Sequence, residues 1–321
     1  MPRLGVAGKR MSGYQAPARR LRFAAPVRRT LIAWAFVAPA LLVYCVIVLR
    51  PLVDAVRTSF YQWDGFGPLD DFVGLDNYRR SFDDSLFWKS LVHTLEWIAL
   101  SVPLGVGLGL LTAVLLSGRV RGRTLMRTIF FLPVVQASAV IALSWRWIYS
   151  PLGPVTTLLD KAHLGFLTYD SGFLGSETWA LPAVAVAGAW AGFGFGMVIF
   201  LAGIQSIDPE LYDAAEVDGA GAWSRFRHVT MPGLRDVTTT VLVLSIIGSF
   251  LVFDLLFILT PGGGLLQSTQ VLGTLIYYRA FNGATINGFN EFGYAAALSV
   301  ILMVIVFALS SLYLLARERK R

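Results

Sequence analysis

The chain has 321 residues, of which 55% are hydrophobic and only 15% are charged, which is too apolar for an ordinary soluble domain. Its net charge of +7 does not indicate nucleic-acid binding. The basic residues concentrate in the two tails and in 118-GRVRGRTLMR-127, where membrane topology and anionic lipid headgroups account for them.

The apolar residues are gathered into six runs free of Asp, Glu, Lys and Arg. A helix needs roughly 20 mostly apolar residues to span a bilayer, because its backbone amides cannot remain unpaired in hydrocarbon. We therefore expect an all-α, polytopic membrane protein with six transmembrane helices. The runs are 31–49, 97–117, 129–145, 178–207, 237–253 and 292–316.

The domain limits follow from these runs. Residues 1–30 are rich in Arg, Ala, Gly and Pro, contain no acidic residue, and are predicted to be a disordered basic tail. Residues 31–316 are expected to form a single six-helix transmembrane domain, and 317–321 a short C-terminal tail.

Lysine and arginine set the orientation, since they are retained in short cytoplasmic loops. With the N-terminus inside, the cytoplasmic segments carry 19 of these residues and the outer segments carry 7. Both termini are therefore expected in the cytoplasm, and so is the loop 205–234.

The first half of this loop, 208-DPELYDAAEVDG-219, has the signals of a short helix. Asp208 suits the N-cap, Pro209 the first helical position, and Gly219 the left-handed residue that follows a helix end. One narrow face of this helix is built largely from small residues at helical spacing, namely Leu211, Ala214, Ala215 and Asp218.

A second helical piece is predicted from Ala222 to about Thr230, carrying Trp223 and Phe226, with Pro232 ending it. The two pieces would form a helical hairpin in water. A docking device and an ordinary loop of amphipathic surface helices are both compatible with this pattern.

The run 197-MVIFLAGIQSIDPELYDAAEVDGAGAWSRFRHVTMPGL-234 resembles the signature loop of binding-protein-dependent ABC importer permeases. In that family the loop forms a coupling helix, which inserts into the cytoplasmic ATPase subunit and transmits its closure to the membrane helices. The chain has Asp213 where the family usually has Glu, and Asp236 where a second Pro is common. The resemblance assigns coupling to Asp213, Ala214, Ala215, Asp218, Gly219 and Ala220, with Phe226 and Pro232 supporting the turn.

Two further stretches resemble the maltose-type membrane subunit of the sugar-transporting branch. They are 72-FVGLDNYRRSF-82 and the series 253-FDLLFILTPGGG-264, 277-YYRAF-281 and 292-FGYAAALSVIL-302. This resemblance implies a prokaryotic plasma membrane, a second related permease subunit, two ATPase subunits and an extracytoplasmic sugar-binding protein.

The sequence contains no motif for chemistry of its own. There is no G-x-x-x-x-G-K-[ST] phosphate loop, so ATP and Mg²⁺ are expected on a partner ATPase and no cofactor in this chain. The three histidines lie in separate segments without H-E-x-x-H, and we predict neither a metal site nor catalytic residues. The single Cys45 excludes an internal disulfide.

Candidates for a substrate path lie on the fifth run. Ser245, Ser249 and Phe253 recur at i, i+4 and i+8, and Asp254 is an ionisable group near the outer end. Hydroxyls and ring faces together suit a sugar, although serines also serve helix packing and the carboxylate could reach the headgroups.

These features predict the permease subunit of an ATP-driven sugar importer that works by alternating access. Two alternatives stay open. One is a member of the same superfamily that carries another small polar solute, such as a polyol or a glycerol phosphate ester. The other is an ATPase-independent transporter or a membrane enzyme.

Overall fold

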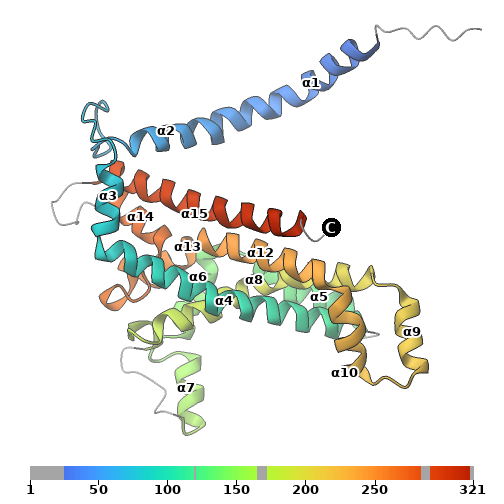
Figure 1. Ribbon diagram of the computed structural model, residues 1–321. Coiled ribbons are helices and arrows are strands. Elements are labelled where there is room, and N and C mark those ends of the chain that lie inside the picture. Colours follow the sequence, from blue (N-terminus) through green and yellow to red (C-terminus); the bar gives the residue numbers. More distant parts are fainter. Residues whose placement is uncertain (1–24, 119–120, 165–171, 283–289, 319–321) are drawn as a thin grey trace, which may run out of the picture. The chain divides into compact units, whose positions relative to one another are not determined.

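The computed structural model of the chain describes residues 25–118, 121–164, 172–282 and 290–318 (Figure 1). The chain is nearly all helical, at 79%, and the described part contains no β-strand, only an isolated bridge between Tyr61 and Phe72. Among the described residues, four helices are long and apolar enough to span a membrane, or up to six if each of two bent pairs counts as one span. The expected all-helical membrane class is thus confirmed.

The chain divides into two units, Met1–Val53 and Asp54–Arg321. The first contains α1 (Ala25–Tyr44), the π-helical turn η1 (Cys45–Leu49) and the start of α2 (Arg50–Thr58). The wide turn precedes Pro51, whose ring would clash with the fourth carbonyl before it in a regular α-helix. Because α1 begins at Ala25, residues 25–30 of the predicted tail are helical, and residues 1–24 lie outside the described part.

The second unit is organised around two long helices, α4 (Ser85–Ser117) and α8 (Ala180–Gln205), which pack along each other. Gly109 permits close approach, since a Cβ at this position would lie 3.0 Å from the backbone of Phe193 and Met197. α4 begins well before the charge-free run 97–117, because Asp84 caps it by accepting a hydrogen bond from the Leu86 amide at 2.9 Å.

The run 129–145 does not form one straight helix. It is divided among α5 (Arg123–Phe131), the 3₁₀ turn η2 (Leu132–Val135) and α6 (Ser138–Ile148), and the two arms are bent by 97°. Pro133 lacks the amide that a continuous helix requires, and the break falls directly after it.

The fifth run is also broken. α12 (Arg235–Phe250) ends before Phe253, whose backbone is non-helical at φ −140°, and α13 (Asp254–Leu259) begins a new direction. The expectation that one helix continues past Asp254 is therefore wrong. Two 3₁₀ turns, η6 (Pro261–Gly263) and η7 (Leu265–Gln267), then lead to α14 (Leu272–Phe281) and α15 (Phe292–Glu318).

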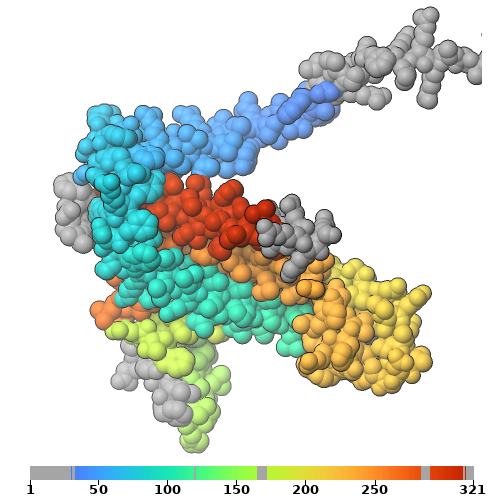
Figure 2. Space-filling view, in the orientation of Figure 1, coloured from blue at the N-terminus to red at the C-terminus, as the bar shows by residue number. Residues whose placement is uncertain are grey.

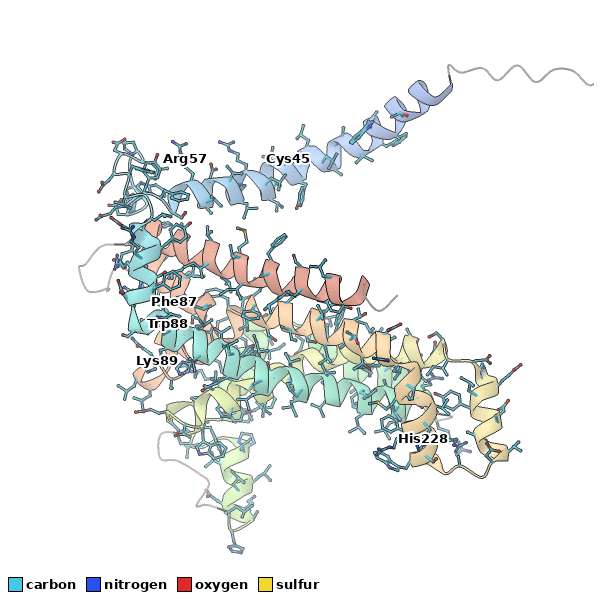
Figure 3. All side chains as sticks on the ribbon, viewed as in Figure 1. Cys45, Arg57, Phe87, Trp88, Lys89 and His228 are labelled. Carbon is cyan, nitrogen blue, oxygen red and sulfur yellow. The ribbon has the colours of Figure 1, made fainter. Side chains whose placement is uncertain are left out.

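Shorter helices occupy the ends of this unit. α3 (Asp76–Asp83) and α7 (Pro154–Lys161) lie toward one end, and α9 (Pro209–Val217) and α10 (Ala222–Arg225) project from the other (Figures 1 and 2). The labelled side chains separate in the same way: His228 lies at the projecting end and Phe87, Trp88 and Lys89 at the opposite end (Figure 3). The segment 205–234 is thus a protrusion of the helical unit.

Candidate functional site: the projecting hairpin and two pockets

The first arm of the hairpin is α9, and both of its ends are capped as the sequence predicts. The Asp208 carboxylate accepts a hydrogen bond from the Glu210 amide at 3.0 Å. At the other end, the Gly219 amide donates to the Glu216 carbonyl at 3.0 Å and the Ala220 amide to the Ala215 carbonyl at 2.9 Å. This pair of bonds is a Schellman motif, and Gly219 takes the left-handed conformation it requires, at φ +72°.

The second arm runs without interruption through α10, the π-helical turn η5 (Phe226–Thr230) and α11 (Met231–Gly233). The prediction that Pro232 ends this arm is wrong, because the helix passes through it and stops at Leu234. The wide turn, in which the Met231 amide donates to the Phe226 carbonyl, provides the room that the proline ring needs. The chain then bends by 69° into α12.

The two arms are joined to each other and to the helix bundle. The hydroxyls of Tyr212 and Thr230 are hydrogen-bonded at 3.0 Å, and Arg225 pairs with Glu216 at 3.1 Å. At the base, Ile207 and Leu234 are buried in the same apolar cluster as the ends of α8 and α12. A force applied to the hairpin therefore reaches α8 and α12 directly.

The hairpin carries large apolar side chains that are exposed among its charged ones. Val217 is 89% exposed, Trp223 71% and Leu211 55%, although all three lie in a segment otherwise suited to water. Large exposed apolar side chains that converge on one protrusion are typical of a protein-binding surface.

The predicted coupling residues all lie on this hairpin. Exposed members are Asp213, Ala214, Asp218, Gly219 and Pro232, and half-buried members are Ala215, Ala220 and Phe226. Their assignment to coupling stays a prediction.

The four substrate-path candidates do not form a single stripe. Ser245 and Ser249 are half-buried on α12, whereas Phe253 lies in the break that follows, and Asp254 is exposed at the start of α13. The Phe253 ring instead stacks on Phe257 with centroids 5.0 Å apart.

A pocket of about 320 Å³ lies within the second unit where the two broken spans meet α4 and α8. Gln136 and Ser138 contribute polar side chains, and Trp97 contributes its ring, which packs against Gly188. Gly192 leaves open space on the α8 side, because a Cβ there would meet nothing within 4 Å. The indole nitrogen of Trp97 is buried and forms no hydrogen bond. A buried donor is normally paired, so this unpaired nitrogen is unusual within the described part of the chain.

Sequence reasoning did not select the residues of this pocket. Trp97 lies in a charge-free run with no feature that distinguishes it from its apolar neighbours. Only the combination of Pro133 with Gln136 in 132-LPVVQAS-138 could have indicated the break that creates the pocket. A second pocket, of about 430 Å³, lies beside α3 at the end opposite the hairpin and was not predicted either.

Among the described residues, no three His, Cys, Asp or Glu side chains are grouped to hold a metal ion. His93 lies against the Gln270 carbonyl at 3.1 Å, a contact between α4 and the segment before α14, and His228 lies against the Ser224 carbonyl at 3.0 Å, one helical turn away.

Bent membrane helices, a projecting hairpin rooted among them and a pocket at the breaks define a helical transport component of a membrane. Residues 105–321 match the family of the binding-protein-dependent transport system inner membrane component, and the chain belongs to this family.

Curated relatives and a solved structure agree with this assignment. The chain is 34% identical to a probable ABC transporter permease, YurN of Bacillus subtilis, over 87% of this chain and 94% of the relative. It is 32% identical to the lactose transport system permease LacF of Rhizobium radiobacter, over 89% and 94%. Its fold is similar to a chain in the crystal structure of a bacterial alginate ABC transporter in complex with an alginate pentasaccharide-bound periplasmic protein. That match has a TM-score of 0.76 and 22% identity, and covers 91% of this chain and 96% of the other.

Proposed function

We propose that the chain is a membrane-spanning permease subunit of an ATP-driven importer, and that it translocates a sugar delivered by an extracytoplasmic binding protein. The observation that carries this proposal is the hairpin 208–234, which is capped, is rooted in α8 and α12, and exposes large apolar side chains on its free surface. The hairpin is the coupling helix that contacts a cytoplasmic ATPase.

The proposed topology has six spans, with both termini in the cytoplasm. The bent pair α5–α6 is one span, and α12 is another, while the arm 222–233 that precedes α12 belongs to the cytoplasmic hairpin. The subunit works with a second permease and two ATPase copies, which bind ATP and Mg²⁺. It has no catalytic site of its own. Closure of the ATPases displaces the hairpin, and the helices rooted at Ile207 and Leu234 switch the side of the membrane to which the path is open.

Sugar as the solute is supported by the relatives and by the inner pocket. LacF is named for lactose transport, and the structural neighbour imports alginate. The pocket is lined by the Trp97 ring and by the polar side chains of Gln136 and Ser138, and the latter two suit hydroxyl groups. Val252 and Leu255 in its wall flank the candidates Phe253 and Asp254, while Ser245 and Ser249 lie further along α12.

Another small polar solute, such as a polyol or a glycerol phosphate ester, would suit the same architecture, and a solute panel tested for thermal stabilisation of the purified complex distinguishes these cases. An ATPase-independent transporter would not need the exposed hairpin surface.

The decisive experiment is Ala214→Arg on the exposed face of α9. Arginine is well tolerated in helices, so the hairpin should persist while its surface becomes bulky and charged. We expect the ATPase that copurifies with the wild-type chain from native membranes to be lost. Leu152→Arg, at a position that is 93% exposed outside the hairpin, is the control and should retain it. Retention of the ATPase by Ala214→Arg would refute the coupling role.

A further inference from the structure

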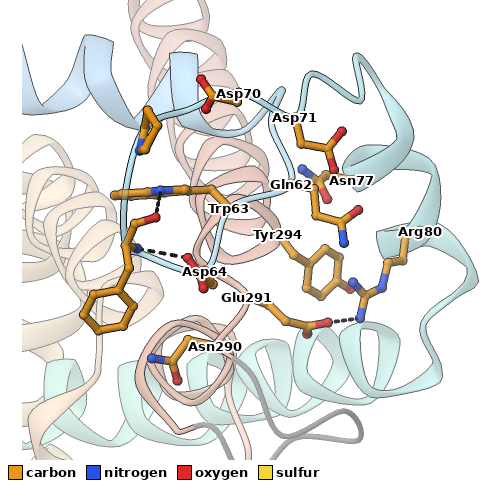
Figure 4. A pocket seen from close by; sticks show the side chains of 12 residues that line it. Gln62, Trp63, Asp64, Asp70, Asp71, Asn77, Arg80, Asn290, Glu291 and Tyr294 are labelled. Carbon is orange, nitrogen blue, oxygen red and sulfur yellow. Dashed lines mark hydrogen bonds and ion pairs between the residues drawn. The ribbon is translucent and has the colours of Figure 1, made fainter.

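The second pocket, of about 430 Å³, lies at the end of the bundle opposite the hairpin (Figure 4). Its walls are the segment 62–71, α3 and the start of α15, all within the second unit. This volume is within the range of about 300–1,000 Å³ that is usual for sites of small ligands.

The aromatic wall of this pocket is held in place by specific contacts. The Trp63 indole donates to the carbonyls of Phe66 and Gly67 at 3.0 and 3.2 Å, and the Trp63 carbonyl accepts from the Gly293 amide at 3.0 Å. The Trp63 ring also lies against the Phe292 ring, with centroids 5.6 Å apart. The segment is therefore fastened to α15, and its aromatic surface is formed before any ligand arrives.

The polar wall consists of planar side chains. Gln62 and Asn290 contribute amides, and Asp64, Asp70 and Asp71 contribute carboxylates. Asn77 also lines the pocket, but its amide nitrogen already donates to the Ser59 and Tyr61 carbonyls at 3.0 Å each. The carboxylates of Asp70 and Asp71 are exposed and form no hydrogen bond or ion pair with other described residues, so they are available to a ligand.

The charges in the pocket are unbalanced. Its cation, Arg80, is already paired with Glu291 and lies over the Tyr294 ring at 4.4 Å. Glu291 is further paired with Arg279 at 3.1 Å. The remaining carboxylates, Asp64, Asp70 and Asp71, therefore give the pocket a net negative charge.

We propose that this outer pocket is a second carbohydrate-binding site of the permease, for a neutral oligosaccharide and not for a uronic-acid chain. A rigid indole offers a surface to the apolar face of a sugar ring, and planar amides and carboxylates exchange hydrogen bonds with its hydroxyls. The excess of carboxylates in the pocket repels the carboxylate groups of a uronic-acid chain. This inference rests on the proposed function for its transport role.

A row of aromatic rings leads away from the pocket toward the broken fifth span. Phe292 lies 4.9 Å from Phe281, Phe281 lies 5.1 Å from Tyr277, and Tyr277 lies 5.2 Å from Phe253, all between ring centroids. Phe281 is 59% exposed, and Tyr277 and Phe253 are partly exposed. These ring contacts link the wall of the outer pocket, side chain by side chain, to the break beside the inner pocket.

The test uses the full chain with its copurifying subunits in lipid nanodiscs. Saturation-transfer NMR measures binding of lactose, maltotriose and N,N′-diacetylchitobiose as neutral probes and trigalacturonic acid as an anionic probe. We expect at least one neutral probe to bind, and Trp63→Ala to weaken it about tenfold or more, which corresponds to the loss of a ring contact and its supporting bonds. Trp147→Ala, at a tryptophan that is 65% exposed outside the pocket, is the matched control and should leave binding unchanged.

The charge argument has its own variant, Asp70→Asn with Asp71→Asn, which changes no contact within the described part of the chain. Neutral probes should bind within about threefold of wild type, since amides still form hydrogen bonds. Binding of trigalacturonic acid should rise about three- to tenfold, as expected for removing two charges a few ångströms away in water.

Three results would overturn the proposal: no binding of any neutral probe to the wild type, binding insensitive to Trp63→Ala, or an unchanged response to trigalacturonic acid in the double variant. If the double variant instead loses capture of the binding protein, the pocket takes a basic side chain of that partner and the sugar site is refuted. Failure of the transport proposal is detected separately, by retention of the ATPase in Ala214→Arg.

Discussion

The buried ion pairs of Arg279 provide the sharpest prediction about stability. Arg279 on α14 donates to Asp84 at 2.7 Å and to Glu291 at 3.1 Å, and its side chain is only 7% exposed. The Tyr294 hydroxyl also donates to Asp84, at 2.9 Å. One guanidinium thus connects α14 with the start of α4 and with the residue before α15.

Replacing this side chain, in Arg279→Met, keeps much of its volume but leaves Asp84 without its cation and Glu291 with only one of its two. Breaking a buried pair by removing one partner costs about 3–5 kcal/mol. The lower end applies here, because Asp84 keeps the Leu86 amide and Tyr294, and Glu291 keeps Arg80. At about 2–4 °C per kcal/mol, Tm should fall by about 6–12 °C.

The assay is thermal unfolding of the detergent-purified chain followed by fluorescence size-exclusion chromatography. Arg79→Met is the matched control: its pair with Asp76 spans 3.5 Å with side chains 79% and 69% exposed, so its loss should cost less than about 0.5 kcal/mol. Combining Arg279→Met with Asp84→Asn should cost less than the sum of the single changes. Equal Tm values for Arg279→Met and Arg79→Met would refute this reasoning.

Three further changes test packing, the hairpin turn and the inner pocket. Gly194→Ala should lower stability by about 1–3 kcal/mol, because its Cβ would lie 2.5 Å from the Phe130 carbonyl. Gly192→Ala is the control and should be neutral, because its Cβ would meet nothing within 4 Å. Equal thermal stability of the two variants would contradict this reasoning. Gly219→Ala, at φ +72°, should cost about 1–2 kcal/mol and raise hydrogen exchange in 208–234 alone, so unchanged exchange there would count against the turn. Trp97→Phe should reduce uptake of the transported sugar about five- to tenfold, because it shortens a ring that lines the inner pocket. Tm should change little, since the indole nitrogen has no hydrogen bond to lose, and wild-type uptake would exclude the indole from the path.

The parts of the fold that depend on local chemistry were predictable from the sequence. Charge-free runs located the apolar helices, and Asp208 and Gly219 located both ends of α9, because a cap and a left-handed turn depend on single residues and their immediate neighbours. The hairpin itself was predictable for the same reason.

The breaks within helices were not predictable in the same way. Pro133 coincides with a 97° bend, whereas Pro232 lies within a continuous helix and Pro103 lies inside α4. Whether a proline bends, ends or merely widens a helix depends on what packs around it, which no local pattern contains. The fifth span breaks at Phe253 without any proline. The residue spacing of Ser245, Ser249 and Phe253 therefore gave no sign that Phe253 lies outside the helix that carries the two serines.

Both pockets depend on contacts between distant segments. The inner one joins α4, α8 and two breaks, and the outer one joins residues near 65 with residues near 291. The aromatic and acidic residues of 60-FYQWDGFGPLDDF-72 were visible in the sequence, but only the contact with α15 makes them a cavity.

The central claim is that the hairpin contacts an ATPase in the cytoplasm, and a photo-crosslinking residue at position 217 tests it most directly. Val217 is 89% exposed, so the probe should reach a partner without disturbing the fold. In native membranes the crosslinked product should contain the ATPase, and the same probe at position 152 should not capture it. A crosslink from position 217 to an extracytoplasmic protein, or to membrane helices of this chain alone, would contradict the account.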